Sequence, residues 1–204
     1  MKRQRRDDIV ARADDAYKNS SYAEYSVAKA IEGKYKQQRF LMILLYIGVA
    51  IGVVGLLVGI SQLFPGLGMI ALFSVALGPL AVWMMVFFTW HKVSIEYKYV
   101  IDHSEIVFST VYGGKSEKEM LRCKVKDFEL IAPLNDEYKG QLEAFNADIT
   151  VEAYPSLSSY DIYFALKTDE NNKKTAVIFQ VTNYTLKAFK YYNKDALVMT
   201  ETMR

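Results

Sequence analysis

Hydrophobic and polar positions divide this chain of 204 residues into three regions. Residues 40–90 contain no Asp, Glu, Lys, Arg or His, and most of their side chains are apolar. The residues before this stretch are mostly polar, and from residue 91 onward apolar and polar positions tend to alternate. We therefore predict a polar N-terminal tail over 1–39, a membrane-embedded region over 40–90 and a β domain over 91–204.

The uncharged region is long enough for two membrane crossings, since one spanning helix needs about 20 apolar residues. Pro65-Gly66 predicts a turn between them, because proline removes a helical donor and such dipeptides mark turns. The prediction is a transmembrane hairpin with helices over 40–60 and 67–90. Lys and Arg flank its outer ends and are absent from the connection, and cytoplasmic loops carry the excess of these residues. We expect a multi-pass cell-membrane protein with both termini in the cytoplasm.

The side chains of the two predicted spans disfavour a transporter or pump. Neither span contains an ionisable residue that could form an ion site or a proton relay. Near the second exit the aromatic residues Trp83, Phe87, Phe88 and Trp90 are typical of the belt that forms at headgroup level.

Four glycines mark one face of the first predicted span. Their spacings are four, three and four residues, and the positions are Gly48, Gly52, Gly55 and Gly59. Small residues on one face let another helix approach closely in lipid. We expect this face to pack against the second helix of the same chain, with a homodimer through the first helix as the alternative.

The N-terminal tail begins with a basic cluster formed by Lys2, Arg3, Arg5 and Arg6. These residues are candidate contacts for anionic lipid headgroups, which attract basic residues near the inner leaflet. The alternative is a solvated tail whose charge only enforces topology, and the cluster does not have the aromatic platform expected for nucleic-acid binding.

Further along the tail, Ser21 and Glu24 match a helix capping box. Apolar positions then recur every three or four residues, which predicts a juxtamembrane amphipathic helix. These positions are Tyr22, Tyr25, Ala28, Ile31 and Tyr35.

The region after the spans has the period-two alternation of half-buried strands. It predicts a hairpin that turns at Asp102-His103-Ser104 and a second reversal at Gly113-Gly114. Further strands are predicted over 121–126, 127–133, 149–154, 160–168 and 175–181, with a loop over 134–148 that includes a helical turn near 140–145. A final helix is predicted over 184–192, capped by Asn183. The fold class is membrane α+β, with a small antiparallel barrel or sandwich of about seven strands and a C-terminal helix.

Four stretches of the β domain resemble an uncharacterised family of small bacterial membrane proteins. They read SIEYKYVI, VKDFELIAP, DIYFAL and AVIFQ…LKAFKYY. Members of that family have a two-helix hairpin followed by a cytosolic domain similar to pleckstrin-homology (PH) domains. The resemblance covers about residues 40–195 and implies this fold, without an activity, a cofactor or a catalytic residue.

Several combinations of reactive residues do not predict a catalytic or metal site. Adjacent Asp102, His103 and Ser104 on a turn cannot form a relay, because triad contacts are made by side chains that converge through space. His91 and His103 have no metal-ligand spacing with the single cysteine, Cys123, which we predict to be a core residue. Gly113-Gly114-Lys115-Ser116 lacks the upstream glycine of a phosphate loop, and Asp136-Glu137 is typical of a solvated acidic pair. No cofactor or metal is expected.

The sequence therefore favours a non-enzymatic two-pass membrane protein whose PH-like domain binds a protein partner or organises a membrane complex. One alternative is a lipid-surface sensor that acts through the basic tail, with help from Arg122, Lys124 and Lys126. A more remote one is a membrane-bound enzyme.

Overall fold

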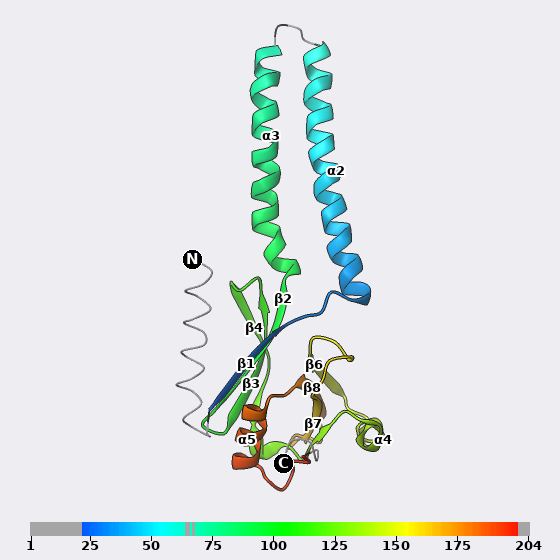
Figure 1. Cartoon of the computed structure of the whole chain (residues 1–204), viewed down its shortest axis with the longest axis vertical. Coiled ribbons are helices and arrows are strands. Elements are labelled where there is room, and N and C mark those ends of the chain that lie inside the picture. The colour runs from blue at the N-terminus through cyan, green and yellow to red at the C-terminus, as the bar shows by residue number, and fades with distance from the viewer. Residues whose placement is uncertain (1–21, 64–65, 67, 200–204) are drawn as a thin grey trace. The chain divides into compact units, whose positions relative to one another are not determined.

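The computed structural model describes residues 22–63, 66 and 68–199. The chain forms two compact units (Figure 1). One unit consists of the residues up to Lys29 together with Glu96–Val111 and Ser116–Arg204, and the other consists of Ala30–Ile95 and Tyr112–Lys115.

The second unit is a helical hairpin. Its helices α2 (Gly33–Leu63) and α3 (Gly68–Thr89) run side by side, and a 3-10 turn, η2 (Trp90–Val93), follows them (Figure 1). The two helices are separate, as predicted, since α2 ends at Leu63 and α3 begins at Gly68, while Pro65 of the predicted turn lies outside the described residues. Helix α2 begins earlier than residue 40 and includes the polar residues of its first turns. Of the helices within the described residues, α2 is the one that is long and apolar enough to count as a candidate membrane span.

The facing sides of α2 and α3 meet through small and aromatic residues. The Tyr46 hydroxyl lies 2.6 Å from Thr89 Oγ1, which itself donates to the carbonyl of Met85, so Tyr46 is the donor to Thr89. Farther along, a Cβ atom placed on Gly78 would lie 3.4 Å from Cγ1 of Val53. These contacts define the side of α2 that faces α3.

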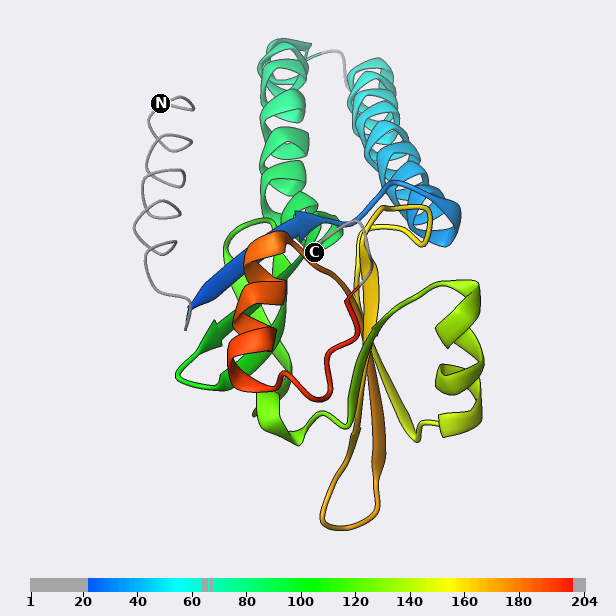
Figure 2. The same ribbon diagram turned by 60° about the horizontal axis from the view of Figure 1, so that its bottom comes forward.

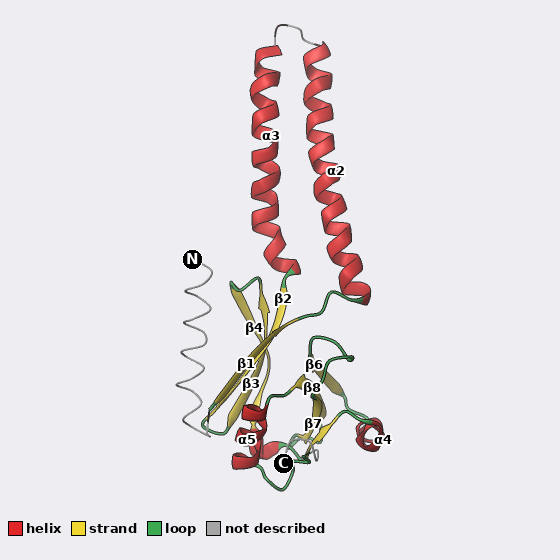
Figure 3. Cartoon of the chain, in the orientation of Figure 1, coloured by secondary structure: helices red, strands yellow, loops and turns green. Residues whose placement is uncertain are grey.

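The first unit contains two four-stranded sheets (Figure 3). One sheet has the order β1-β2-β3-β4, formed by β1 (Ala23–Ala28), β2 (Ile95–Asp102), β3 (Glu105–Tyr112) and β4 (Ser116–Lys124). The other has the order β5-β7-β8-β6, formed by β5 (Leu130–Pro133), β7 (Ile162–Thr168), β8 (Lys174–Gln180) and β6 (Ile149–Ala153). The expectation of a purely antiparallel domain is wrong at one place, because β6 pairs with β8 in parallel. After β6 the chain does not form a hairpin with the next strand, because β8 lies between β6 and β7 in the sheet. Strand β8 is antiparallel to β7 and parallel to β6.

Strand β1 corrects the prediction of a juxtamembrane helix. Residues 23–28 form an extended strand that pairs antiparallel with β2, with Tyr25 opposite Tyr99. Ala23, Tyr25 and Val27 are the more buried positions and alternate with exposed Glu24, Ser26 and Ala28, which is the period of a strand. Ser21, the first residue of the predicted capping box, lies outside the described residues, and the Glu24 carboxylate forms an ion pair with Lys98 of β2 at 3.1 Å. The described residues thus form eight strands, and the additional one precedes the helical hairpin.

An aromatic cluster joins the two sheets to the C-terminal helix α5 (Asn183–Tyr192), which lies along β1 (Figure 2). Tyr99 and Phe108 of the first sheet contact Phe179 of the second, with ring centroids 5.7 and 5.3 Å apart. Phe179 in turn lies 5.7 Å from Phe189 of α5. Phe108, Phe179 and Phe189 are fully buried, so this cluster is the centre of the domain core.

Two short elements complete the unit. The helical turn expected near 140–145 is a longer helix, α4 (Asp136–Phe145), whose N-cap Asn135 accepts a hydrogen bond from the backbone N–H of Tyr138. It covers a second, smaller core around Phe164 and Leu166. Helix α5 confirms the predicted C-terminal helix, but its N-cap is Thr182 and not Asn183. The expected fourth strand, 127–133, is shortened to β5, because Asp127 belongs to a 3-10 turn, η3 (Val125–Asp127), and residues 128–129 connect that turn to the strand.

Candidate functional site

Three segments of the hairpin unit converge at the end where α2 begins and α3 ends. The Tyr35 hydroxyl of α2 donates to the carbonyl of Val93 at 2.5 Å and accepts the backbone N–H of Ile95 at 3.3 Å. The turn between β3 and β4 joins the same segment, since the backbone N–H of Gly113 donates to the carbonyl of Ser94 at 2.7 Å. The start of α2, the η2 turn and the 112–115 turn are therefore fixed to one another.

Gly113 is required for this close approach. A Cβ atom at this position would lie 2.5 Å from Cβ of His91, closer than real side chains come. Its φ angle of 57° also lies in the left-handed region that favours glycine. The prediction that Gly113-Gly114-Lys115 forms a hairpin loop and no phosphate loop is confirmed.

Basic side chains of these segments lie over aromatic rings. The Arg39 guanidinium is 5.0 Å from the centroid of the Trp90 ring and 5.6 Å from that of the Tyr35 ring. The Lys115 ammonium group is 4.3 Å from the centroid of the Phe87 ring. Each arrangement is a cation–π contact, which holds the charge at the face of the ring.

The charge of this unit is strongly one-sided. The unit contains five Lys and Arg residues and a single carboxylate, that of Glu32. All five basic residues belong to the converging segments. We call them the basic collar: Lys34, Lys36, Arg39, Lys92 and Lys115. Within the described part of the chain, Arg39, Lys92 and Lys115 make no ion pair with a carboxylate.

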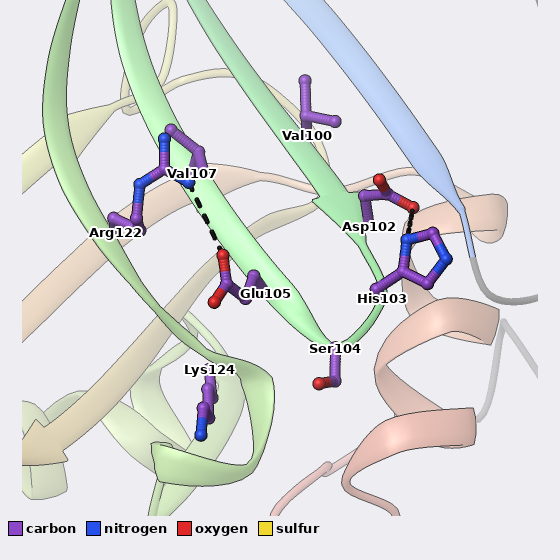
Figure 4. A pocket seen from close by; sticks show the side chains of 8 residues that line it. All are labelled: Val100, Asp102, His103, Ser104, Glu105, Val107, Arg122 and Lys124. Carbon is purple, nitrogen blue, oxygen red and sulfur yellow. Dashed lines mark hydrogen bonds and ion pairs between the residues drawn. The ribbon is translucent and has the colours of Figure 1, made fainter.

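The Asp102-His103-Ser104 turn borders a shallow depression on the β domain (Figure 4). Its volume is about 410 Å³, and Glu105, Arg122 and Lys124 are among its lining residues. His103 and Ser104 both have positive φ, as expected for a tight turn, and the His103 side chain is 93% exposed. His103 Nδ1 contacts Asp102 Oδ1 at 2.7 Å, whereas the Ser104 hydroxyl points away from the imidazole (Figure 4). These three residues form the predicted turn, and their geometry gives no serine–histidine relay.

Arg122, which lines this depression, is paired with carboxylates. Arg122 donates to Glu119 at 2.8 Å and lies 3.5 Å from Glu105. The hydrogen bond from Arg122 holds the pKa of the Glu119 carboxyl below its usual value. Arg122 is therefore engaged with carboxylates of its own domain, which weakens the interpretation that it contacts lipid.

One family model matches residues 19–199 of the chain, and that family is described as a bacterial PH-like domain, DUF6106. The chain belongs to this family. It is an uncharacterised family, as the strand motifs indicated. No curated protein and no solved structure matches the chain. The matched range begins before β1, so the PH-like domain of this family includes a strand that the resemblance over 40–195 had left in the tail.

In this PH-like domain Cys123 is a core residue, as predicted. It is 6% exposed, and burial, which disfavours the thiolate, raises the pKa of its thiol to about 12. A thiol with so high a pKa is a poor nucleophile at neutral pH. Asp136 and Glu137 lie in the first turn of α4, where negative charge favours the helix dipole, and both are exposed.

The four glycines of α2 lie away from α3 in the PH-like protein. At about 100° per residue, their directions differ by about 180–240° from that of Tyr46, which faces α3. No heavy atom of the described residues lies within 4 Å of a Cβ placed on Gly48, Gly52, Gly55 or Gly59. We expected this face to pack against α3, and at Gly48 and Gly52 the structure shows no such packing. Dimerisation through this face stays a prediction.

The basic cluster at the start of the chain lies outside the described residues. Lys2, Arg3, Arg5 and Arg6 therefore stay candidate lipid contacts from sequence alone. Sequence reasoning used the Lys and Arg residues that flank the spans, Arg39 and Lys92 among them, as topology signals. It did not connect Lys115 with them, because the β3–β4 turn is separate from the spans in sequence. The signal that could have found Lys115 is its position in a Gly-Gly turn at the end of β3, the strand that follows β2 in a hairpin.

Proposed function

We propose that this protein is a two-pass membrane protein that holds a PH-like module in the cytoplasm at the membrane surface, as a non-catalytic docking module for a protein partner. The observation that carries the proposal is the pairing of β1 with β2. These strands are hydrogen-bonded neighbours, yet the whole helical hairpin lies between them in the sequence.

This pairing supports two crossings. If α2 crosses the bilayer, the chain must return before Ile95, because β1 and β2 belong to one sheet and must lie on one side. Helix α3 is the element available for the return, since its 22 residues carry no charge and can cross a hydrocarbon core about 30 Å thick. The side is the cytoplasm, because the basic collar flanks both helices at this end.

The connections between module and hairpin are short. Residues 29–32 separate β1 from α2, and Ser94 alone separates η2 from β2. A module tethered at both ends by so few residues stays close to the membrane. Such a tether suits the assembly of a partner at the bilayer better than the capture of distant ligands.

The loop between β6 and β7 supports a protein partner. Its Leu157 and Tyr160 side chains are 65% and 87% exposed. Tyr160 nevertheless has an anchored backbone, since its carbonyl accepts Nε2 of Gln180 at 3.1 Å and the next carbonyl, that of Asp161, accepts the N–H of Val181 at 2.9 Å. An exposed tyrosine on a fixed backbone loses little entropy on binding and is a common anchor of protein interfaces.

The topology is tested by labelling single cysteines in intact cells, in a Cys123→Ala background. Ser61→Cys, near the end of α2, should react with a membrane-impermeant maleimide from outside, and Ser158→Cys should react only after the membrane is opened. Labelling of both from the same side would contradict the two-pass arrangement.

Partner binding is tested by placing a photocrosslinking residue at Tyr160 and, as a control, at exposed Lys118 of β4. A protein crosslinked from Tyr160 but not from Lys118 should then bind the purified chain directly. Leu157→Ser with Tyr160→Ser should abolish that binding. Crosslinks to lipid alone, or substrate turnover by the purified chain, would argue against a docking module.

A further inference from the structure

We infer that the basic collar at the base of the hairpin is a binding site for the headgroup of an anionic phospholipid. The inference rests on the proposed function, because it requires the hairpin to lie in a bilayer. It concerns different residues from the N-terminal cluster, and it is carried by three features of the hairpin unit.

The first feature is the construction of the site. Tyr35 is 6% exposed and ties the start of α2 to the segment after η2, while Gly113 ties the 112–115 turn to that segment through Ser94. Arg39 and Lys115 therefore project from chain segments that cannot move apart independently. A site assembled from fixed segments loses less entropy on binding than one made of flexible tails.

The second feature is the chemistry of the cations. The Trp90 and Tyr35 rings contact the Arg39 guanidinium, and guanidinium groups that stack on rings keep their N–H edge free. That planar edge matches two oxygens of a phosphate. Lys115 adds a compact charge over Phe87, whose ring also stacks with Trp83 at 5.7 Å. The cations thus lie directly beside the aromatic residues expected at headgroup depth.

The third feature is the lack of neutralising charge. The hairpin unit has five basic residues and one carboxylate, and the three collar cations Arg39, Lys92 and Lys115 form no ion pair within the described residues. By contrast, Arg122 and Lys167 of the other unit pair with carboxylates at 2.8 and 3.0 Å. The unsatisfied charge lies where the polar end of the hairpin meets its apolar length. An anionic headgroup is the ligand that is abundant at that boundary and has the complementary charge.

The experiment uses the full chain in phosphatidylcholine vesicles that contain a minority of phosphatidylglycerol. Either lipid is supplied with brominated acyl chains at equal mole fraction, and quenching of Trp90 fluorescence is measured in a Trp83→Phe variant. Bromo-phosphatidylglycerol should quench Trp90 more strongly than bromo-phosphatidylcholine does, because the collar enriches the anionic lipid.

The test variant combines Arg39→Gln with Lys115→Gln, and the matched control combines Lys174→Gln with Lys187→Gln. The control removes the same charge and also two cation–π contacts, those with Phe145 and Tyr184. Each collar cation removed should lower the preference for phosphatidylglycerol about five-fold, the effect of about 1 kcal/mol per basic residue near an anionic surface. The control should keep the preference.

Equal quenching by the two lipids in the unaltered chain would overturn the inference, as would a preference that survives in the test variant. Quenching of Trp83 in a Trp90→Phe variant separates this failure from failure of the proposed function. If bromo-phosphatidylcholine does not quench Trp83, the hairpin is not in the bilayer; if it does, only the headgroup site is refuted.

Discussion

Tyr99 and Tyr163 are buried to the same degree but differ in their hydrogen bonding. Each is 1% exposed. The Tyr99 hydroxyl donates to the carbonyl of Gln180 at 2.9 Å and lies 2.9 Å from Thr185 Oγ1, whereas the Tyr163 hydroxyl has no partner within the described residues. A buried hydroxyl stabilises a fold only when its hydrogen bonds are made. The two residues therefore form a matched pair for substitution.

We predict that Tyr99→Phe lowers the free energy of unfolding by about 1–2 kcal/mol, because the Gln180 carbonyl and the Thr185 hydroxyl lose a buried partner. Tyr163→Phe should be neutral or stabilising, because it removes a polar atom that gains nothing from burial. Denaturant unfolding of the full chain in detergent, followed by near-UV circular dichroism, measures both. An equal loss in the two variants would show that Tyr163 has a hydrogen-bond partner.

Cys123 gives a prediction for the dependence on pH. Because burial raises the pKa of its thiol to about 12, Cys123 should react only slowly with iodoacetamide at pH 8 in the folded chain and rapidly in denaturant. The unfolded thiol ionises near pH 8.5 while the folded one stays neutral, so its contribution to stability is complete below that pH and is lost as the pH rises toward 12. Equal reactivity with and without denaturant would contradict the buried position.

At the scale of single elements, a larger side chain should affect hairpin stability differently on the two faces of α2, the one that packs against α3 and the one that carries the glycines. We predict that Gly78→Leu on α3 destabilises the hairpin, since even a Cβ there would contact Val53 at 3.4 Å. Gly52→Leu adds the same volume to the opposite face of α2 and should leave hairpin stability unchanged in a monomer. Thermal unfolding in detergent, at a concentration where the chain is monomeric, measures the difference. Equal destabilisation would place α3 against the glycine face.

The elements also show what the sequence could and could not predict. The hairpin, most of the strands and α5 were predictable, because charge-free length and period-two alternation are local signals. Strand β1 was not, since Tyr22, Tyr25, Ala28, Ile31 and Tyr35 satisfy a helical spacing while Ala23, Tyr25 and Val27 satisfy a strand spacing. Pairing with β2, a long-range contact, decides between the two. The basic collar depends on the same kind of contact, because Lys115 joins it through the Gly113–Ser94 hydrogen bond and the contact with Phe87.

For the whole molecule, the helical hairpin lies in the sequence between the paired strands β1 and β2, which predicts that it is an insertion into an otherwise self-contained PH-like domain. Ala28 lies opposite Glu96 in the sheet, so a short turn can replace residues 29–95 and connect β1 directly to β2. We expect that shortened chain, with its tail and all eight strands, to fold as a soluble PH-like module. Cooperative thermal unfolding and dispersed amide resonances would demonstrate it.

The control is the fragment 91–204, which has the same C-terminal sequence but no β1. It should aggregate or fail to fold cooperatively, because β2 becomes an open edge and Tyr25 no longer packs against Tyr99, whose ring centroid lies 5.6 Å away. A well-folded fragment would mean that β1 is dispensable.

The order of strands around the hairpin also has a consequence for biosynthesis. Strand β1 leaves the ribosome before either helix, and its partner β2 follows only after both. At about 5–20 residues per second, roughly three to thirteen seconds pass between the two strands. In a chain that crosses the membrane twice, the module can be completed only after the hairpin has inserted correctly. A hairpin that stops halfway would separate β1 from β2 by a bilayer and leave the edges of both strands unpaired.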